Sequence, residues 1–109
     1  MLKKKVSFLK KLSVKIRRSI LDTIYNAKSG HIGGSLSCVD ILISLYFGKN
    51  LKFDVKRPNL ETRDRLIVSK GHATAAYYSV LAHLGFIKFS ELNTYCKNNT
   101  RLATHLSER

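Results

Sequence analysis

Histidines are the side chains of this sequence that are best suited to chemistry. His31 lies in a stretch rich in glycine and serine, residues 29–37, and His72 directly follows a glycine. An imidazole exchanges protons near neutral pH and can bond to sugar hydroxyls or phosphates without a permanent charge. On residue type alone, a functional and a structural role fit His31 and His72 equally well. His83 lies within a predicted helix, where a structural or surface role is expected, and His105 lies in a polar C-terminal segment.

Other common kinds of active site have no counterpart in the sequence. Cys38 and Cys96 are far apart and lack the CxxC spacing of zinc and redox sites, and the histidines lack the spacing of zinc ligands. The glycine-rich stretch is neither a P-loop nor a GxGxxG motif, and no serine or cysteine stands in a nucleophile elbow. We therefore predict no metal site and two free thiols, with Cys38 buried.

The elements that position His72 are predicted as a strand, a turn and a helix over residues 64–85. The apolar run LIV at residues 66–68 is typical of a buried strand, the glycine of SKGHA makes a sharp turn, and a helix then runs to Gly85. In open α/β sheets, ligands bind at the carboxyl ends of strands, where backbone amides and the helix dipole favour anions. His72 and Lys70 are thus placed to meet a phosphate, although a surface role fits Lys70 as well.

Most of the remaining chain is predicted to be helical. Residues 1–28 form a basic amphipathic helix, residues 29–37 a loop, and a second helix begins at Ser37 and ends at Gly48. Residues 49–63 form a connecting loop, and a last short helix begins at Ser90. The apolar residues of the first helix recur at steps of three and four: Leu9, Leu12, Ile16, Ile20, Ile24 and Ala27.

Length and charge bound the class of protein. The 109 residues include 20 Lys plus Arg against 7 Asp plus Glu, a net charge of +13, and 44% are hydrophobic, so one small globular domain is expected. No apolar stretch approaches the roughly 20 residues of a membrane span, and no secretory signal is recognisable, so a cytoplasmic protein is expected. Residues 1–18 carry eight of the basic groups and no acid. A solvated helix face explains this run, and nucleic-acid or anionic-surface binding is the less favoured alternative.

Two motifs, in this order and at this separation, resemble a known enzyme family. SGHIGG at residues 29–34 and SKGHA at residues 69–73 are similar to the N-terminal portion of transketolase, and the resemblance covers about residues 15–105. Ile32 stands where long transketolases usually have proline, which resembles the split type whose N- and C-terminal halves are separate chains. Deoxyxylulose phosphate synthases share a motif of the first kind but not the SKGHA turn.

The resemblance implies an α/β fold. Residues 1–109 are then a partial N-terminal domain, a mostly helical piece of a thiamine-diphosphate-binding three-layer α/β/α fold with one short parallel strand recognisable. The implied enzyme is a transferase that uses thiamine diphosphate and Mg²⁺ to move a two-carbon ketol unit between sugar phosphates, as in the pentose phosphate pathway.

The resemblance also implies roles for individual residues. His31 matches a histidine that lies beside the substrate carbonyl and shuttles protons. His72 matches one near the cofactor diphosphate and the reacting centre, where Gly71 allows close approach. His105 matches the histidine that contacts the donor hydroxyls, although the family has His-Pro there and this chain has His105-Leu106. The expected catalytic residues are thus the three histidines, and the expected cofactor-binding residues are His72 and Gly71.

Parts of the family's machinery have no counterpart in this sequence. These are the metal-binding Gly-Asp-Gly stretch with its downstream asparagine, and the glutamate that activates the cofactor ring from the other half of the enzyme. We therefore expect a truncated chain that is inactive alone and acts with a complementary C-terminal chain or the missing segments, as a dimer or hetero-oligomer. Two alternatives stay open: a non-catalytic remnant whose exposed apolar helix faces bind a partner protein, and a basic nucleic-acid-binding module.

Overall fold

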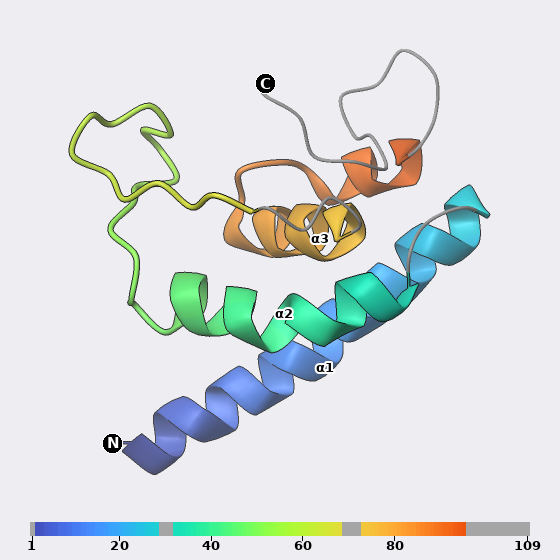
Figure 1. Cartoon of the computed structure of the whole chain (residues 1–109), viewed down its shortest axis with the longest axis horizontal. Helices are drawn as coiled ribbons and strands as arrows, with labels where there is room; N and C mark the ends of the chain where they lie inside the picture. The colour runs from blue at the N-terminus through green and yellow to red at the C-terminus, as the bar shows by residue number, and fades with distance from the viewer. Residues whose placement is uncertain (1, 29–31, 69–72, 96–109) are drawn as a thin grey trace.

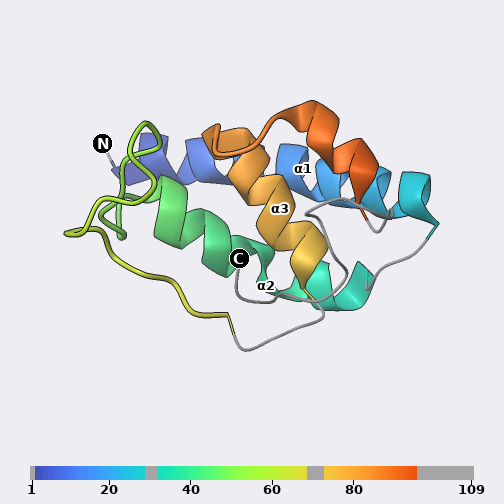
Figure 2. The same ribbon diagram turned by 90° about the horizontal axis from the view of Figure 1, so that it is seen from above.

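The computed structural model describes residues 2–28, 32–68 and 73–95 of the chain. Within these ranges each α-helix packs against the other two, and a short 3₁₀-helix packs on two of them (Figure 1). Seen from above, the third α-helix runs obliquely across the first two (Figure 2). The elements are α1 (Leu2–Ala27), α2 (Ile32–Phe47), α3 (Thr74–Leu84) and the 3₁₀-helix η1 (Phe89–Thr94).

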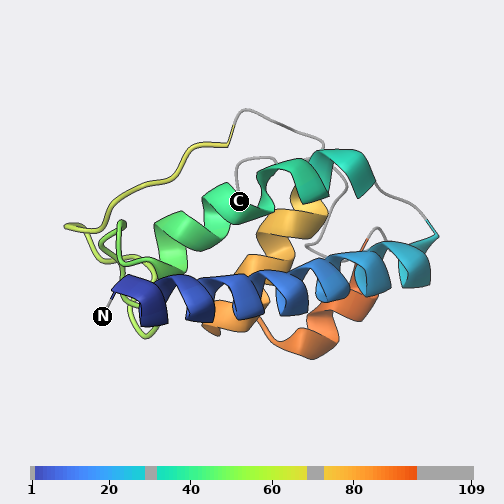
Figure 3. The ribbon, with the colours of Figure 1, turned by 90° about the horizontal axis from the view of Figure 1, so that it is seen from below.

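Helix α1 runs along one side of the molecule (Figure 3). Ile16, Ile20 and Ile24 form its buried stripe, with exposed fractions of 0, 0 and 6%. Residues three or four positions apart share one face of a helix, so this stripe follows from the apolar periodicity of the sequence. The stripe packs in a common core with apolar side chains of α2 and α3.

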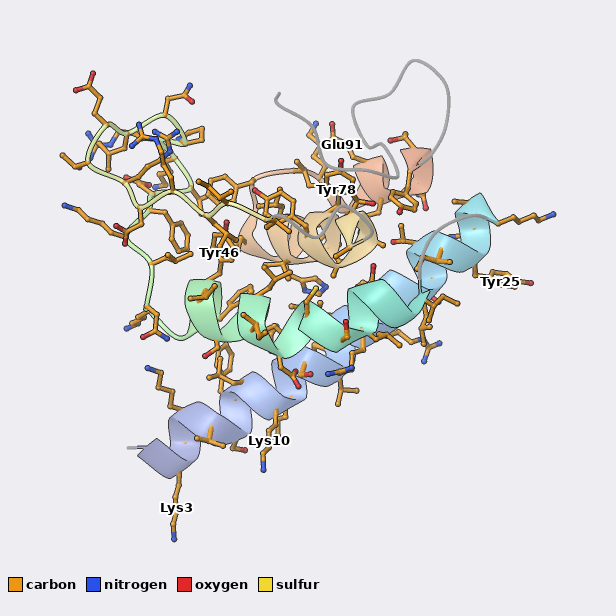
Figure 4. The ribbon with its side chains drawn as sticks, in the orientation of Figure 1. Lys3, Lys10, Tyr25, Tyr46, Tyr78 and Glu91 are labelled. Carbon is orange, nitrogen blue, oxygen red and sulfur yellow. The ribbon has the colours of Figure 1, made fainter. Side chains whose placement is uncertain are left out.

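The opposite face of α1 is basic and exposed. Lys3 and Lys10 point away from the rest of the described residues (Figure 4), and the basic run of the N-terminal segment is thus mainly a solvated helix face. Lys5 is different, because its Nζ donates a hydrogen bond to Gly48 O over 2.8 Å and ties α1 to the residue after α2. None of the described helices is long and apolar enough to cross a membrane.

Arg17 joins α1 to α2 through a polar network beside the core. Its Nη2 lies 3.0 Å from Asp40 Oδ2, and its Nη1 donates to Leu36 O over 3.3 Å. Ser13 Oγ accepts from Arg17 Nε at 3.1 Å and donates to Asp40 Oδ1 at 2.8 Å. Exposed ion pairs contribute little free energy, so the main effect of this network is to fix how the two helices are rotated against each other.

Helix α2 begins earlier than the sequence predicts. The sequence indicates a loop over residues 29–37, but residues 32–37 form the first turns of α2. Glycine and serine weaken a helix in isolation. Here Ser35 is fully buried, and the same helix buries Val39, Leu42 and Ile43 against its neighbours. Tertiary packing therefore overrides the local preference for a loop.

Helix α3 ends where the sequence places its stop. Gly85 has a φ of 99°, and its N–H donates to Leu81 O over 3.0 Å, which makes a left-handed C-cap. An L side chain is strained at such a φ, so glycine is the residue that suits this position.

Gly85→Ala is expected to lower the free energy of unfolding by about 1 kcal/mol because of this strain. The matched control is Gly33→Ala in the first turn of α2, where an added Cβ meets no atom within 4 Å. We expect that control to be neutral or slightly stabilising. Urea denaturation of both variants measures the difference, and equal stabilities would contradict the strain assigned to Gly85.

The strand predicted at residues 66–68 is not formed within the described part of the chain. This segment has no regular secondary structure, and Ile67 is 86% exposed, although Leu66 packs partly against the core. A strand needs the N–H and C=O groups of a neighbouring strand, and the described residues contain none. The described residues have the mostly helical character that was predicted, and they form no sheet.

Candidate functional site

The structure describes the ends of the two histidine motifs and the segments that follow them, but not the motif histidines. Helix α2 begins at Ile32, directly after His31 in the chain, and α3 begins at Thr74, two residues after His72. These two helix starts are therefore the described frame of the candidate site. The predicted site residues themselves lie outside the described residues: His31, Gly71, His72 and His105.

The starts of α2 and α3 meet at a buried hydrogen bond. The backbone N–H of Ala76 donates to Ser35 Oγ over 3.3 Å, and both residues are fully buried. Ser35 comes four residues after His31, and Ala76 comes four residues after His72. Helix α2, which includes the end of SGHIGG, and α3, which follows SKGHA, are thus joined at their first turns, although the two motifs are about forty residues apart in the chain.

The start of α3 is held on another side by the residue that follows η1. Thr74 Oγ1 and Tyr95 Oη lie 2.8 Å apart, and each residue is only 1% exposed. Tyr78 packs edge-on against Tyr95 with ring centroids 6.1 Å apart (Tyr78 is labelled in Figure 4). The first turn of α3 therefore has fixed contacts to both α2 and Tyr95.

The electrostatics at the start of α3 favour an anion. The first turn contains no acidic residue, and its N-cap, Ala73, makes no side-chain capping bond. The N–H groups of a first helical turn carry partial positive charge, and here no carboxylate of the helix itself neutralises it. Such a helix start is compatible with a phosphate group near its N-terminus.

Sequence reasoning missed the residues that join the two helix starts. Ser35 lies in the stretch predicted as a loop, and a buried serine has no distinctive sequence signal. The run Ala73-Thr74-Ala75-Ala76 does offer one, because consecutive small residues at a helix start allow close packing of another backbone. All four of these residues are buried.

His83 has a structural role, as its place in a helix suggests. Its Nε2 lies 3.0 Å from Ser19 Oγ on α1, and its ring packs edge-on against Phe89 with centroids 4.9 Å apart. Burial lowers the pKa of His83, and the positive charge of Lys15 lowers it further. His83 therefore connects α3, α1 and η1 best as a neutral imidazole.

This lowered pKa predicts a loss of stability in mild acid. Between the folded pKa and the ordinary value of 6.5 the unfolded chain binds more protons at His83 than the folded chain does, so the free energy of unfolding falls as pH decreases through this window. Urea denaturation at several pH values between 5 and 7.5 measures the slope. His83→Gln is expected to make it shallower, and an unchanged slope in that variant would assign the effect to other groups.

A concave region lies between the end of α2, the following loop and α3. Its volume is about 740 Å³, and its lining includes Tyr46, Tyr77 and Arg65. Burial, with the neighbouring Tyr77, raises the pKa of Tyr46 above its ordinary range (Tyr46 is labelled in Figure 4). Leu66 and Ile67 also line this region, so the segment with strand-like sequence borders an open hollow.

Comparison with known protein families decides how the two motifs are to be understood. Residues 9–108 match the family described as "Transketolase, thiamine diphosphate binding domain". The chain belongs to the transketolase family. The match includes both histidine motifs and the helices joined by Ser35 and Ala76.

Two of the relatives of this chain are named as transketolase subunits. The chain is 39% identical over 94 residues to the 6-deoxy-6-sulfo-D-fructose transketolase subunit SqwG of Clostridium sp. strain MSTE9, covering 86% of this chain and 34% of that protein. It is 37% identical over 100 residues to an apulose-4-phosphate transketolase subunit of Phocaeicola vulgatus, covering 92% and 35%. A transketolase of Rhodobacter capsulatus is 34% identical over 97 residues, covering 87% and 14%. The chain thus spans about a third of the length of the two subunits.

The described part of this transketolase chain offers no metal centre. Within residues 2–28, 32–68 and 73–95, no group of three or more His, Cys, Asp or Glu side chains could hold an ion. Cys38 is half-buried rather than buried as predicted, and its Sγ donates to Ser35 O over 3.6 Å.

Proposed function

We propose that this chain forms part of the cofactor site of a transketolase that moves a two-carbon ketol unit between sugar phosphates. The observation that carries the proposal is the family match over residues 9–108, which includes both histidine motifs. The hydrogen bond from Ala76 N–H to Ser35 Oγ joins α2, which includes the end of SGHIGG, to α3, which follows SKGHA. The proposed substrates are sugar phosphates of the kind that the pentose phosphate pathway interconverts.

The residues at the start of α3 fit one end of the cofactor. The first turn has no acidic side chain, and its neighbours are small and buried, so a diphosphate is electrostatically acceptable there. When bound, thiamine diphosphate supplies the carbon nucleophile that takes up the ketol unit. The Mg²⁺ expected with the diphosphate finds no cluster of ligands in the described part of the chain. Its ligands would come from outside that part.

Three histidines and a glycine carry the proposed chemistry of this chain. His31 moves a proton at the substrate carbonyl, and His72 acts near the diphosphate and the reacting carbon. His105 bonds to hydroxyl groups of the donor sugar. Gly71 leaves room for close approach because it has no side chain. These assignments rest on the similarity of SGHIGG and SKGHA to the family motifs and on the suitability of imidazole for proton transfer near neutral pH.

The proposed active enzyme contains more polypeptide than these residues. The chain spans about a third of two relatives that are named as subunits, which supports a complementary C-terminal chain and a dimer or hetero-oligomer. The exposed Ile67 and the hollow beside residues 66–68 support the addition of strands there, which would complete a three-layer α/β/α domain.

A chimeric enzyme tests the proposal. Residues 9–108 replace the matching segment of the apulose-4-phosphate transketolase subunit of Phocaeicola vulgatus, and the chimera is produced with the rest of that enzyme. We expect it to bind thiamine diphosphate in calorimetry and to transfer the ketol unit of apulose 4-phosphate. A folded chimera that binds no thiamine diphosphate would contradict the proposal. It would move the interpretation toward a non-catalytic remnant or a nucleic-acid-binding module, which the family match disfavours.

A further inference from the structure

Helix α3 has no capping side chain of its own. The first N–H groups of any helix lack intrahelical partners, and a serine or aspartate at the N-cap usually accepts from the second or third residue. In α3 the N-cap is Ala73, which has only a methyl group, and the first intrahelical bond runs from Tyr77 N–H to Ala73 O at 3.2 Å. The N–H of Ala76, the third helical residue, is therefore the last one that needs an outside acceptor.

Ser35 provides that acceptor from a different helix. Its Oγ lies 3.3 Å from Ala76 N, in a position that is fully closed to solvent. Water cannot replace the bond without opening the packing between α2 and α3. Ser35 therefore does for α3 what an N-cap serine does for its own helix, although it precedes Ala76 by 41 residues.

We propose that Ser35 is a positioning residue for the candidate active site. By capping α3 from the first turn of α2, it fixes the start of α3, two residues after His72 in the chain, relative to the start of α2, directly after His31. The functional meaning of this placement rests on the proposed function, in which both histidines act. The capping bond itself does not depend on that function.

A second buried serine shows that the role depends on position. Ser79 lies in α3, about one turn after Ala76, and is also fully buried, but its Oγ has no hydrogen-bond partner among the described residues. Ser79 thus fills space, whereas Ser35 fills space and satisfies a backbone N–H. Loss of the Ser35 oxygen leaves a buried donor unpaired, which is more costly than loss of an unpaired hydroxyl.

The test compares Ser35→Ala with Ser79→Ala in the ¹⁵N-labelled 109-residue chain. We expect the Ala76 amide proton to exchange with solvent at least roughly tenfold faster in Ser35→Ala than in the unmodified chain. Ser79→Ala should leave that rate unchanged. Ser35→Thr keeps an accepting oxygen and is expected to restore most of the protection.

Imidazole signals separate positioning from a merely structural role. In Ser35→Ala we expect the Cε1–H resonances and titration curves of His31 and His72 to shift, while those of His83 stay in place. Ser79→Ala should move the signals of none of the three histidines. If the His31 and His72 signals do not move in a folded Ser35→Ala chain, the positioning role is overturned.

Two further outcomes keep the proposal distinct from the proposed function. If Ser35→Ala does not fold, hydrogen exchange in the unmodified chain still tests the capping bond. An Ala76 amide that exchanges without protection there would overturn it. If the chimera carries out no ketol transfer but the imidazole signals shift as expected, the proposed function fails and the positioning by Ser35 stands. If the chimera with Ser35→Ala still transfers the ketol unit and the His31 and His72 signals do not shift, the proposed function stands and only the positioning role of Ser35 is overturned.

Discussion

Replacing His72 by alanine is expected to lower the kcat of ketol transfer by about 10²- to 10⁴-fold, the contribution that a positioned general acid or base typically makes. The measurement is made in the chimeric enzyme with a coupled assay, at saturating thiamine diphosphate. The loss should appear in kcat more than in KM, because a group that moves a proton acts on the transition state more than on substrate binding.

The matched control is a histidine outside the motifs. His83 lies in α3, the helix that begins two residues after His72, but it bonds to Ser19 and packs on Phe89. His83→Gln should therefore leave kcat nearly unchanged while it lowers the free energy of unfolding. The thermal transition of each variant is recorded beside its activity. Full activity in a folded His72→Ala enzyme, or equal losses in both variants, would contradict the assignment of His72.

Ile20→Ala is expected to lower the free energy of unfolding by about 2–5 kcal/mol. Ile20 lies on the buried stripe of α1, is fully inaccessible to solvent and belongs to the core shared with α2 and α3. Truncation removes apolar contacts and leaves a cavity that the surrounding helices can close only partly. A domain of this size has a total stability of roughly 5–15 kcal/mol, so the variant should be largely unfolded under mild denaturing conditions.

Leu21→Ala is the control for this prediction, because it removes a similar side chain from the next position of the same helix. Leu21 is 43% exposed, and its truncation should change the free energy of unfolding by less than about 1 kcal/mol. Urea denaturation followed by circular dichroism gives both values. Similar stabilities of the two variants would contradict the assignment of Ile20, rather than Leu21, to the buried face of α1.

The best-predicted parts of the fold are those with a strong local signal. The apolar steps of three and four in α1 predict which of its faces is buried, and Ile16, Ile20 and Ile24 are indeed closed to solvent. Gly85 predicts the end of α3, because a left-handed residue is a local requirement of the helix terminus. In both cases neighbouring residues alone determine the outcome.

Where distant contacts decide the structure, one prediction was wrong and another was not confirmed. The glycine and serine residues after His31 favour a loop locally, but α2 begins at Ile32 because the helix packs against α1 and α3. Residues 66–68 have the composition of a strand but no neighbouring strand within the described part of the chain. A strand is a property of two segments, so one segment cannot predict it alone.

The candidate site shows the same division. SGHIGG and SKGHA are distinctive enough for the sequence to indicate the family, and the family match over residues 9–108 agrees. The roles of His31, His72, His105 and Gly71 stay predictions, because these residues lie outside the described part of the chain.

By itself, the sequence determined the family, the basic amphipathic first helix and the residue types available for proton transfer, because motifs and periodicity are written in short stretches of chain. Only the tertiary structure decided that Ser35 is buried and accepts a hydrogen bond from Ala76. It likewise decided that His83 bonds to α1. These contacts join residues that are 41 and 64 positions apart. The reason is physical: an uncapped N–H or a half-buried imidazole must find a partner in space, and the packing of the three helices decides which residue is near enough.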